Sequence, residues 1–183
     1  LPLHIQIGDL FLQDGQQAEA LKKYLLVARL YQLRGERAQA INLLQRTLTI
    51  APMDLDIRSQ LIDLMVAEGR VEDAIQQKID LAQATYRMAD LDGAAQILKS
   101  AMKLAPESSH SRRWAFEILN QLTDIDMQRL DWRAALVNLE QMRTLQPEDP
   151  STRARIIDLN YRLAQKGPAL AEADQFVKLL ESR

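Results

Sequence analysis

The strongest constraint on the fold is a repetition of the sequence at an offset of 54 residues. The segment GQQAEALKKYLLVA from Gly15 recurs in pattern as GRVEDAIQQKIDLA from Gly69 (69 minus 15 is 54). Likewise, LLQRTLTIAP, which ends at Pro52, recurs as ILKSAMKLAP, which ends at Pro106. The same offset relates the alanine pairs Ala20 and Ala74, Ala28 and Ala82, and Ala40 and Ala94. Because repeats of this kind stack one copy on the next, the pattern predicts a repeat architecture.

Within each copy, apolar residues fall at helical spacing, with charges between them. Ile41, Leu44 and Leu48 form one such stripe, and Ile75 and Ile79 belong to another. This periodicity predicts amphipathic helices packed on a common core. We expect an all-α fold of about ten helices, at about 3–14, 16–34, 36–50, 54–68, 71–89, 91–105, 109–129, 131–146, 150–166 and 169–182. Since every connection is short, neighbouring helices should be antiparallel.

Helix-end signals separate these segments. Turns are expected at Gly15, Gly35, Gly69 and Gly167, N-caps at Asp54 and Asp131, and helix ends before Pro52, Pro106 and Pro147. The segment DLDG at 90–93 resembles the start of a calcium loop, but the remaining ligands are missing, so a turn and cap is the better interpretation. Trp114 and Trp132 are expected in the core, although exposed tryptophans could anchor a partner.

The pattern resembles the tetratricopeptide repeat (TPR) family, of the bacterial type, whose motif reads W-x2-L-G-x2-Y, A-x3-F and then P over about 34 residues. One full match consists of Tyr24, Val27, Ala28, Tyr31, Ala40, Leu44 and Pro52. Partial matches begin near His4, Leu61, Leu81, Leu119 and Ile156. The resemblance implies a right-handed α-solenoid of antiparallel helix pairs over nearly the whole chain.

The repeats depart from regular TPR spacing. The first two copies start 20 residues apart (Ala40 minus Ala20), so the helices at 16–34 and 71–89 each serve two repeats. The longer interval from Pro106 to Pro147 predicts an unusually long helix at 109–129. We expect a single repeat domain over residues 1–183. Because the first residue is Leu rather than Met, we interpret the chain as a fragment of a longer protein.

Composition narrows the function classes. The net charge of -2, without basic clustering, disfavours nucleic acid as a partner. No apolar run reaches the roughly 20 residues that span a bilayer, so membrane insertion is not expected. The absence of cysteine excludes disulfides, thiolate metal sites and cysteine nucleophiles. We expect a cytoplasmic protein without a cofactor.

Few residues could carry catalysis. His4 and His110 are far apart, and neither has a second ligand one helical turn away, as zinc sites require. Asp124 and Asp126 point about 200° apart on a helix, so they do not converge with Asp131 on a cation. The sequence therefore predicts no catalytic or metal-binding residues and no enzyme activity. A metal-dependent or hydrolytic enzyme remains a distant alternative.

In TPR proteins the concave face commonly holds an extended peptide or a helix of a partner. The resemblance places the groove-lining positions at Arg29, Asp63, Gln83, Tyr86, Arg87, Asn120, Asp124, Asp158, Tyr161 and Arg162. The three aspartates would suit a basic partner, and the two tyrosines offer stacking surface. At the first positions of the clamp that binds chaperone tails stand Ile5 and Asp9, so an acidic tail is not expected.

Two functions remain open. The first is a protein–protein interaction scaffold or adaptor that binds a peptide or helix in the groove. The second is a regulatory, sensor or oligomerisation domain of a larger signalling or transcription-regulating protein. Apolar helix faces would also permit a homodimer.

Overall fold

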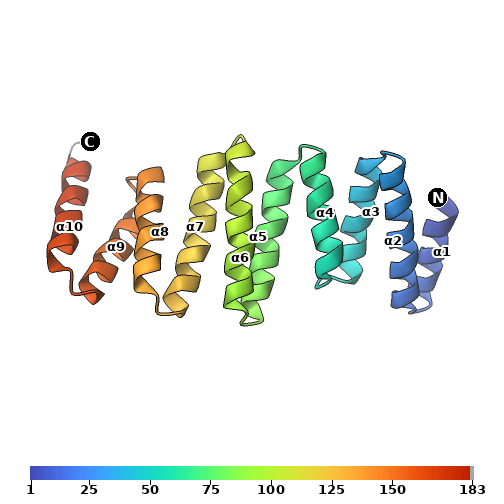
Figure 1. Cartoon of the computed structure of the whole chain (residues 1–183), viewed down its shortest axis with the longest axis horizontal. Coiled ribbons are helices and arrows are strands. Elements are labelled where there is room, and N and C mark those ends of the chain that lie inside the picture. Colours follow the sequence, from blue (N-terminus) through green and yellow to red (C-terminus); the bar gives the residue numbers. More distant parts are fainter. Residues whose placement is uncertain (182–183) are drawn as a thin grey trace. The chain divides into compact units, whose positions relative to one another are not determined.

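The computed structural model describes residues 1–181 and, within them, shows ten α-helices, one short 3-10 helix and no β-strand (Figure 1). The helices are α1 (Pro2–Gln13), α2 (Gln17–Leu33), α3 (Arg37–Ile50), α4 (Leu55–Ala67), α5 (Val71–Arg87), α6 (Leu91–Leu104), η1 (Ala105–Glu107), α7 (Ser111–Gln128), α8 (Trp132–Leu145), α9 (Pro150–Arg162) and α10 (Lys166–Glu181). The predicted all-α fold is confirmed, and α7, with 18 residues, is the longest of these helices.

The 54-residue offset holds at the level of whole helices. Adding 54 to the bounds of α2 gives 71–87, the bounds of α5, and adding 54 to the bounds of α3 gives 91–104, the bounds of α6. Helix α1 maps onto α4 within one residue at its start. The repeating element is therefore a set of three helices, as the double use of 16–34 and 71–89 predicted.

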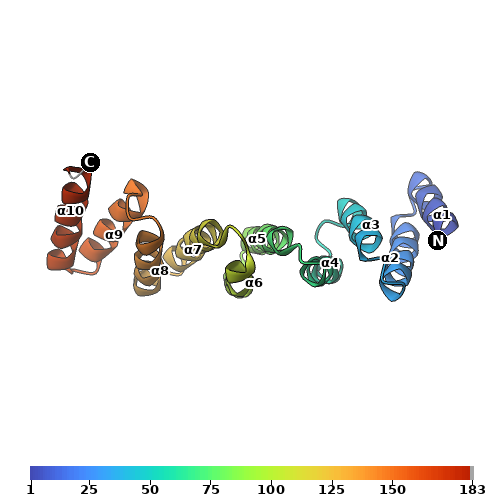
Figure 2. The ribbon, with the colours of Figure 1, turned by 90° about the horizontal axis from the view of Figure 1, so that it is seen from above.

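The contacts divide the chain into two compact units, Leu1–Ala84 and Thr85–Arg183. In the first unit, seen from above in Figure 2, α1 and α3 lie in one layer and α2 and α4 in another. The side chains of Tyr24, Ile41, Leu44 and Leu61 are completely buried between these layers. On α3, Ile41 and Leu44 are three positions apart, which places both on the inner face of that helix.

A polar contact joins the first three helices of this unit. The Tyr24 hydroxyl donates to Asp9 Oδ1 at 2.5 Å, and Arg46 Nη2 donates to the same oxygen at 2.7 Å. The Arg46 guanidinium also lies over the Tyr24 ring. Burial, followed by the hydrogen bond to Asp9, raises the pKa of Tyr24 to about 12. Asp9 thus has an internal role, holding α1 against α2 and α3.

In the second unit, α7 and α9 lie in one layer and α6 and α8 in the other (Figure 2). The core joins α7, α8 and α9 through Leu119, Ala135, Leu139, Met142, Ile156 and Leu159. Trp132 packs against this cluster, and Trp114 is buried in α7. The prediction that the tryptophans belong to the core is confirmed for Trp114, and Trp132 is partly buried at the edge of the core.

Helix α10 is attached mainly through one buried carboxylate. Glu172 is 4% exposed, and its Oε1 accepts a hydrogen bond from Arg153 Nη1 of α9 at 2.5 Å. Its other oxygen accepts from Arg143 of α8. Arg153 is itself buried, and its guanidinium lies over the ring of Phe176. The buried residues of α10 are Ala169 and Glu172, so the ion pairs carry much of its docking.

Six of the connections are tight turns of one kind. In each, a residue with left-handed backbone follows the helix, at Gly15, Gly35, Gly69, Ala89, Leu130 and Ala164. After α1, for example, Gly15 N–H donates to the Leu12 carbonyl and Gln16 N–H to the Phe11 carbonyl. This pair of bonds defines the Schellman motif, and it recurs at the other five turns. The predicted turns at the first three glycines are confirmed.

The fourth predicted glycine turn is wrong. Gly167 is the second residue of α10, and the turn before that helix uses Ala164, with φ of 59°. The next residue, Pro168, is tolerated in the first turn of this helix because the N–H that it lacks has no partner there. Consequently α9 ends at Arg162 and α10 begins at Lys166.

Each helix that follows a tight turn has a buried alanine as its fourth residue. These alanines are Ala20, Ala40, Ala74, Ala94, Ala135 and Ala169, and the first five are 0% exposed. A side chain at this point faces the preceding helix where the two backbones leave the turn. A methyl group fits there, and a larger side chain would push the two helices apart.

The other three connections are longer and carry a proline followed six residues later by an arginine. The pairs are Pro52 and Arg58, Pro106 and Arg112, and Pro147 and Arg153. In the first, Asp54 caps α4 by accepting from Ile57 N–H, and Arg58 Nη2 donates to the Pro52 carbonyl at 2.8 Å. These proline junctions separate the helix groups that the tight turns join.

Candidate partner-binding surfaces

The first candidate surface lies on α7 and α9, and we call it the α7–α9 face. Arg155 of α9 donates from Nη1 to Asn120 Oδ1 at 2.7 Å and from Nη2 to Asp124 Oδ1 at 2.6 Å. Asn120 and Asp124 are one turn apart on α7, so a single guanidinium spans both. The Asp124 side chain is 53% exposed, and the bridge therefore lies at the surface.

The same face continues toward the end of α9. Asp158 accepts from Arg162 Nε at 2.8 Å, one turn apart on the helix, and both side chains are about half exposed. Tyr161 beside them is 67% exposed. Polar groups that already have partners, next to an exposed aromatic ring, form a surface that can contact a peptide without a large desolvation cost.

Two further predicted residues lie at the end of α5. The Tyr86 hydroxyl accepts a hydrogen bond from Gln128 Nε2, at the end of α7. Arg87 is exposed. Gln128 follows Asp124 by one turn, so α7 presents Asn120, Asp124 and Gln128 along one stripe.

In the first unit, Arg29 lines a shallow hollow of about 450 Å³ between α2 and α4, together with Leu25, Leu26, Gln32 and Gln60. Asp63 is exposed on α4, one turn after Gln60. Burial lowers the pKa of Lys78 on α5, and the nearby Asp63 carboxylate opposes this shift. Gln83 is exposed on α5. The ten predicted residues thus divide between the two units: Arg29, Asp63 and Gln83 in the first, and the other seven in the second.

Arg155 is the residue that the sequence interpretation missed. It lies one turn before Asp158 and two turns before Arg162. That alternation of charge along one helix face is a signal that could have found it. Arg155 pairs with Asp124 as Arg162 pairs with Asp158, so neither aspartate is an uncompensated negative charge.

The acidic residues around the α7–α8 turn have separate roles. Asp126 accepts from Asn138 Nδ2 at 2.8 Å, while Asp131 caps α8 by accepting from Ala134 N–H. Burial raises the pKa of Asp126, and the hydrogen bond from Asn138 and the charge of Arg129 oppose that effect. In residues 1–181, no group of three or more His, Asp and Glu side chains could hold a metal ion.

The helix starts show how the remaining polar residues are used. Asp90 caps α6 by accepting from Gly93 N–H at 2.8 Å, which confirms a turn and cap at 90–93. The predicted cap at Asp54 is confirmed as well. His4 is half-buried on α1, and His110 is the exposed residue that precedes α7. No helix in the described part of the chain is both long and apolar enough to cross a membrane.

Schellman turns join antiparallel helices, the helix after each of these turns has a buried alanine as its fourth residue, and prolines mark the other three junctions. These features define a TPR-like helical-repeat fold. No protein-family model matches the sequence, and no curated protein does. Among solved structures, a crystal structure of MamA has a TM-score of 0.48 at 13% identity, over 90% of this chain and 92% of that one. A crystal structure of BtubC (BKLC) from P. vanneervenii has a TM-score of 0.48 at 16% sequence identity, and the match covers 99% of this chain and 88% of that one. YrrB, described as a TPR protein with an unusual peptide-binding site, has a TM-score of 0.46 at 12% sequence identity, and the match covers 85% of this chain and 84% of that one.

Proposed function

We propose that this chain is a protein–protein interaction scaffold that binds a peptide or helix of a partner on the α7–α9 face. The observation that carries the proposal is the Arg155 bridge to Asn120 and Asp124, because it fixes a row of polar groups at the surface beside the exposed Tyr161 ring. Preorganised polar groups lose little side-chain entropy on binding. Binding rather than catalysis, in the cytoplasm and without a cofactor, is the role that we infer.

The predicted preference for a basic partner is limited by the arginines that already pair with Asp124 and Asp158. A basic side chain would have to share Asp124 with Arg155, or Asp158 with Arg162. We therefore propose a partner segment of mixed charge, with an acidic group for Arg155 or Arg162 and an aromatic or aliphatic group for Tyr161. The three residues Arg29, Asp63 and Gln83 form a second, smaller contact area in this proposal.

Site-specific photo-crosslinking tests this function. A photoreactive aromatic residue at Tyr161 is expected to crosslink a defined protein in a lysate of the source organism, while the same residue at Val137, on the outer side of α8 and 53% exposed, should not. Reversal of charge by Asp124→Lys together with Asp158→Lys should abolish the crosslink while the circular dichroism spectrum stays unchanged. Equal crosslinking from both positions would show that the α7–α9 face has no special role.

A second candidate function, oligomerisation within a larger regulatory or sensor protein, is favoured by exposed apolar residues on the terminal helices. Leu3 and Leu10 of α1, and Leu170, Val177 and Leu180 of α10, are each at least half exposed. On each helix they recur at intervals of seven or three residues, which places them on one stripe. A homodimer formed through such a stripe would appear in analytical ultracentrifugation as a mass that rises with protein concentration.

A further inference from the structure

The junction between α6 and α7 differs from the other two proline junctions in its packing. Five and nine residues after the proline, the first junction has Ile57 and Leu61, and the third has Thr152 and Ile156, all of them buried. The middle junction has Ser111 and Ala115 at these positions, and both are partly exposed. Helix α7 begins five residues after its proline, whereas α4 and α9 begin three residues after theirs. The larger buried residues of α7, Trp114 and Ile118, therefore come later, and the small Ser111 and Ala115 lie next to the junction.

The arginine of the middle junction also differs in its contact. Arg58 and Arg153 each donate to the carbonyl of the proline six residues earlier, at 2.8 and 2.9 Å, which closes the loop. Arg112 instead donates from Nη2 to the carbonyl of Leu145, at the end of α8. Its loop is consequently not closed by the arginine, and the side chain spans from α7 to α8.

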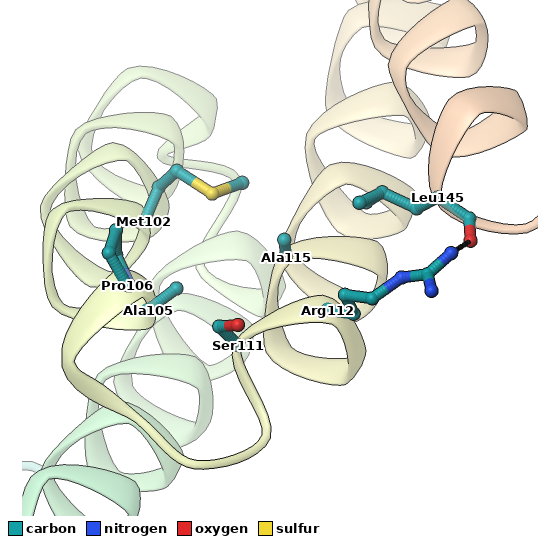
Figure 3. Close-up of a pocket in the computed structure, with 7 residues that line it drawn as sticks. All are labelled: Met102, Ala105, Pro106, Ser111, Arg112, Ala115 and Leu145. Carbon is teal, nitrogen blue, oxygen red and sulfur yellow. Dashed lines mark hydrogen bonds between the residues drawn. The ribbon is translucent and has the colours of Figure 1, made fainter.

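These differences leave a hollow of about 310 Å³ between α6, α7 and α8, which we call the Pro106 hollow. It is lined by Met102, Ala105, Pro106, Ser111, Arg112, Ala115 and Leu145. Figure 3 shows the side chains of Met102 and Leu145 pointing toward the space in front of Ala115 from opposite sides. Its walls are mainly apolar, so the space suits a hydrocarbon side chain better than a polar one.

The surroundings of the Pro106 hollow are cationic. Lys103 is adjacent in sequence to Met102, Arg112 lines the hollow and Arg113 follows it, and all three side chains are exposed. Among the side chains that the structure describes, which do not include that of Glu107, none of these three forms an ion pair, although the Arg113 guanidinium lies over the Trp114 ring. The arginines near the α7–α9 face, by contrast, are paired with aspartates. An apolar hollow beside unpaired cations is complementary to an apolar side chain with acidic neighbours.

The Pro106 hollow is separate from the α7–α9 face. Ala115 and Asn120 are five positions apart on α7, which corresponds to about 140° around the helix axis. A ligand in the hollow would therefore lie on another side of α7 from the Arg155 bridge. The two surfaces can be occupied, and tested, independently.

We propose that the Pro106 hollow is a second binding site, which takes one apolar side chain of a partner protein segment whose flanking residues are acidic. The apolar side chain lies among Met102, Ala115 and Leu145. The flanking carboxylates pair with Arg112 and Arg113, and Arg112 keeps N–H groups available beyond the one that it donates to Leu145. The small side chains of Ser111 and Ala115 leave the space of this site open.

Methyl NMR spectroscopy with synthetic peptides tests the proposal. The probe is a short peptide with a central Leu between Glu residues, and the expected result is saturable shifts of the Met102 and Ala115 methyl signals. A peptide with Ala at the centre should bind about tenfold more weakly or worse, since it buries about three fewer carbons. A peptide with Lys in place of Glu should not bind, and added salt should weaken the Glu peptide.

Three variants keep the test specific. Ala115→Leu places a larger apolar side chain at a partly exposed position that lines the hollow, so it should fill the hollow, leave the fold intact and abolish the shift of Met102. Arg112→Gln should weaken binding of the Glu peptide without closing the hollow. Asp124→Lys with Asp158→Lys should leave this binding unchanged, which separates it from the proposed scaffold function. Unmoved methyl signals at peptide concentrations of about 1 mM, or equal binding by Ala115→Leu, would overturn the proposal.

Discussion

Three of the six Schellman turns place a residue other than glycine in the left-handed conformation. Ala89, Leu130 and Ala164 have φ values of 63°, 59° and 59°, where an L-residue has a steric cost of about 1–2 kcal/mol. Ala89 follows the equivalent Gly35 by 54 residues, so one turn geometry is built with glycine in one copy and with alanine in the other. The geometry of the turn is evidently set by its two hydrogen bonds, and glycine makes it less strained.

We expect Leu130→Gly to raise the free energy of unfolding, by about 0.5–1 kcal/mol, because it removes this strain while the 72% exposed side chain contributes little burial. Leu170→Gly is the matched control. Leu170 is similarly exposed but lies inside α10, where glycine should lower stability by about 1 kcal/mol. Urea denaturation of both variants measures the two effects, and a loss of stability in Leu130→Gly would contradict this account.

Contacts within one helix could be predicted from the sequence, and contacts between separate helices could not. The N-caps at Asp54 and Asp131 were predictable because a carboxylate needs only the N–H groups of its own helix start. The pairing of Arg155 with Asp124 joins residues 31 positions apart, on separate helices. It depends on how α9 is placed along α7, and periodicity within one helix carries no information about that.

At the scale of elements, α10 illustrates a helix that depends on charge. Its stripe of Leu170, Val177 and Leu180 is exposed, and its docked face contributes Glu172 between Arg143 and Arg153. Burying a carboxylate with two guanidinium groups has a large desolvation cost. Removing one of the charged partners destabilises the fold even more, because it leaves a buried charge without its counter-charge. The helix is thus attached by an interaction that tolerates little change.

Glu172→Gln should therefore destabilise the docking of α10, by an amount on the order of 3 kcal/mol, since it leaves two arginines without their anion. Hydrogen–deuterium exchange is expected to become faster in residues 166–181, while α7 and α8 keep their protection. Asp174→Asn, on the exposed side of the same helix, should change nothing. Equal exchange in the wild type and Glu172→Gln would mean that apolar contacts alone hold α10.

Element boundaries followed from sequence wherever glycine or aspartate marks them. The last turn was not predicted correctly because its left-handed residue is Ala164 rather than a glycine. Gly167 indicated a turn three residues too late. The fourth-position alanines, in contrast, recur at every tight turn, and four of the six were visible in the 54-residue offset as the pairs Ala20 and Ala74, and Ala40 and Ala94. Regular packing requires small residues at a fixed spacing, which is visible in the sequence. A turn with a non-glycine residue in the left-handed conformation has no such sequence signal.

At the scale of the whole molecule, a single repeat domain over 1–183 stays a prediction, and the division at Ala84 and Thr85 provides a way to test its cooperativity. In repeat proteins each element contacts mainly its neighbours, so damage in one unit need not unfold the other. Gly8 offers a local perturbation, because a Cβ there would lie 2.6 Å from Cε1 of the buried Tyr24 ring.

We expect Gly8→Ala to lower the stability of the first unit by about 1–3 kcal/mol through this clash, although alanine favours a helix in general. Exchange should accelerate in residues 1–50 and remain slow in α7 and α8. Gly167→Ala, where a Cβ meets no atom within 4 Å, is the control that should be neutral or slightly stabilising. Uniform acceleration along the chain would indicate one fully cooperative domain.

The position of the tryptophans has a practical consequence for such experiments. Both indoles of the chain, at positions 114 and 132, belong to the second unit, and the first unit has none. Tryptophan fluorescence, excited at the long-wavelength edge of the absorption band where tyrosine does not absorb, therefore reports on the second unit alone. Far-ultraviolet circular dichroism reports on all the helices. Unequal midpoints from the two optical signals would reveal a half-unfolded intermediate without any added label.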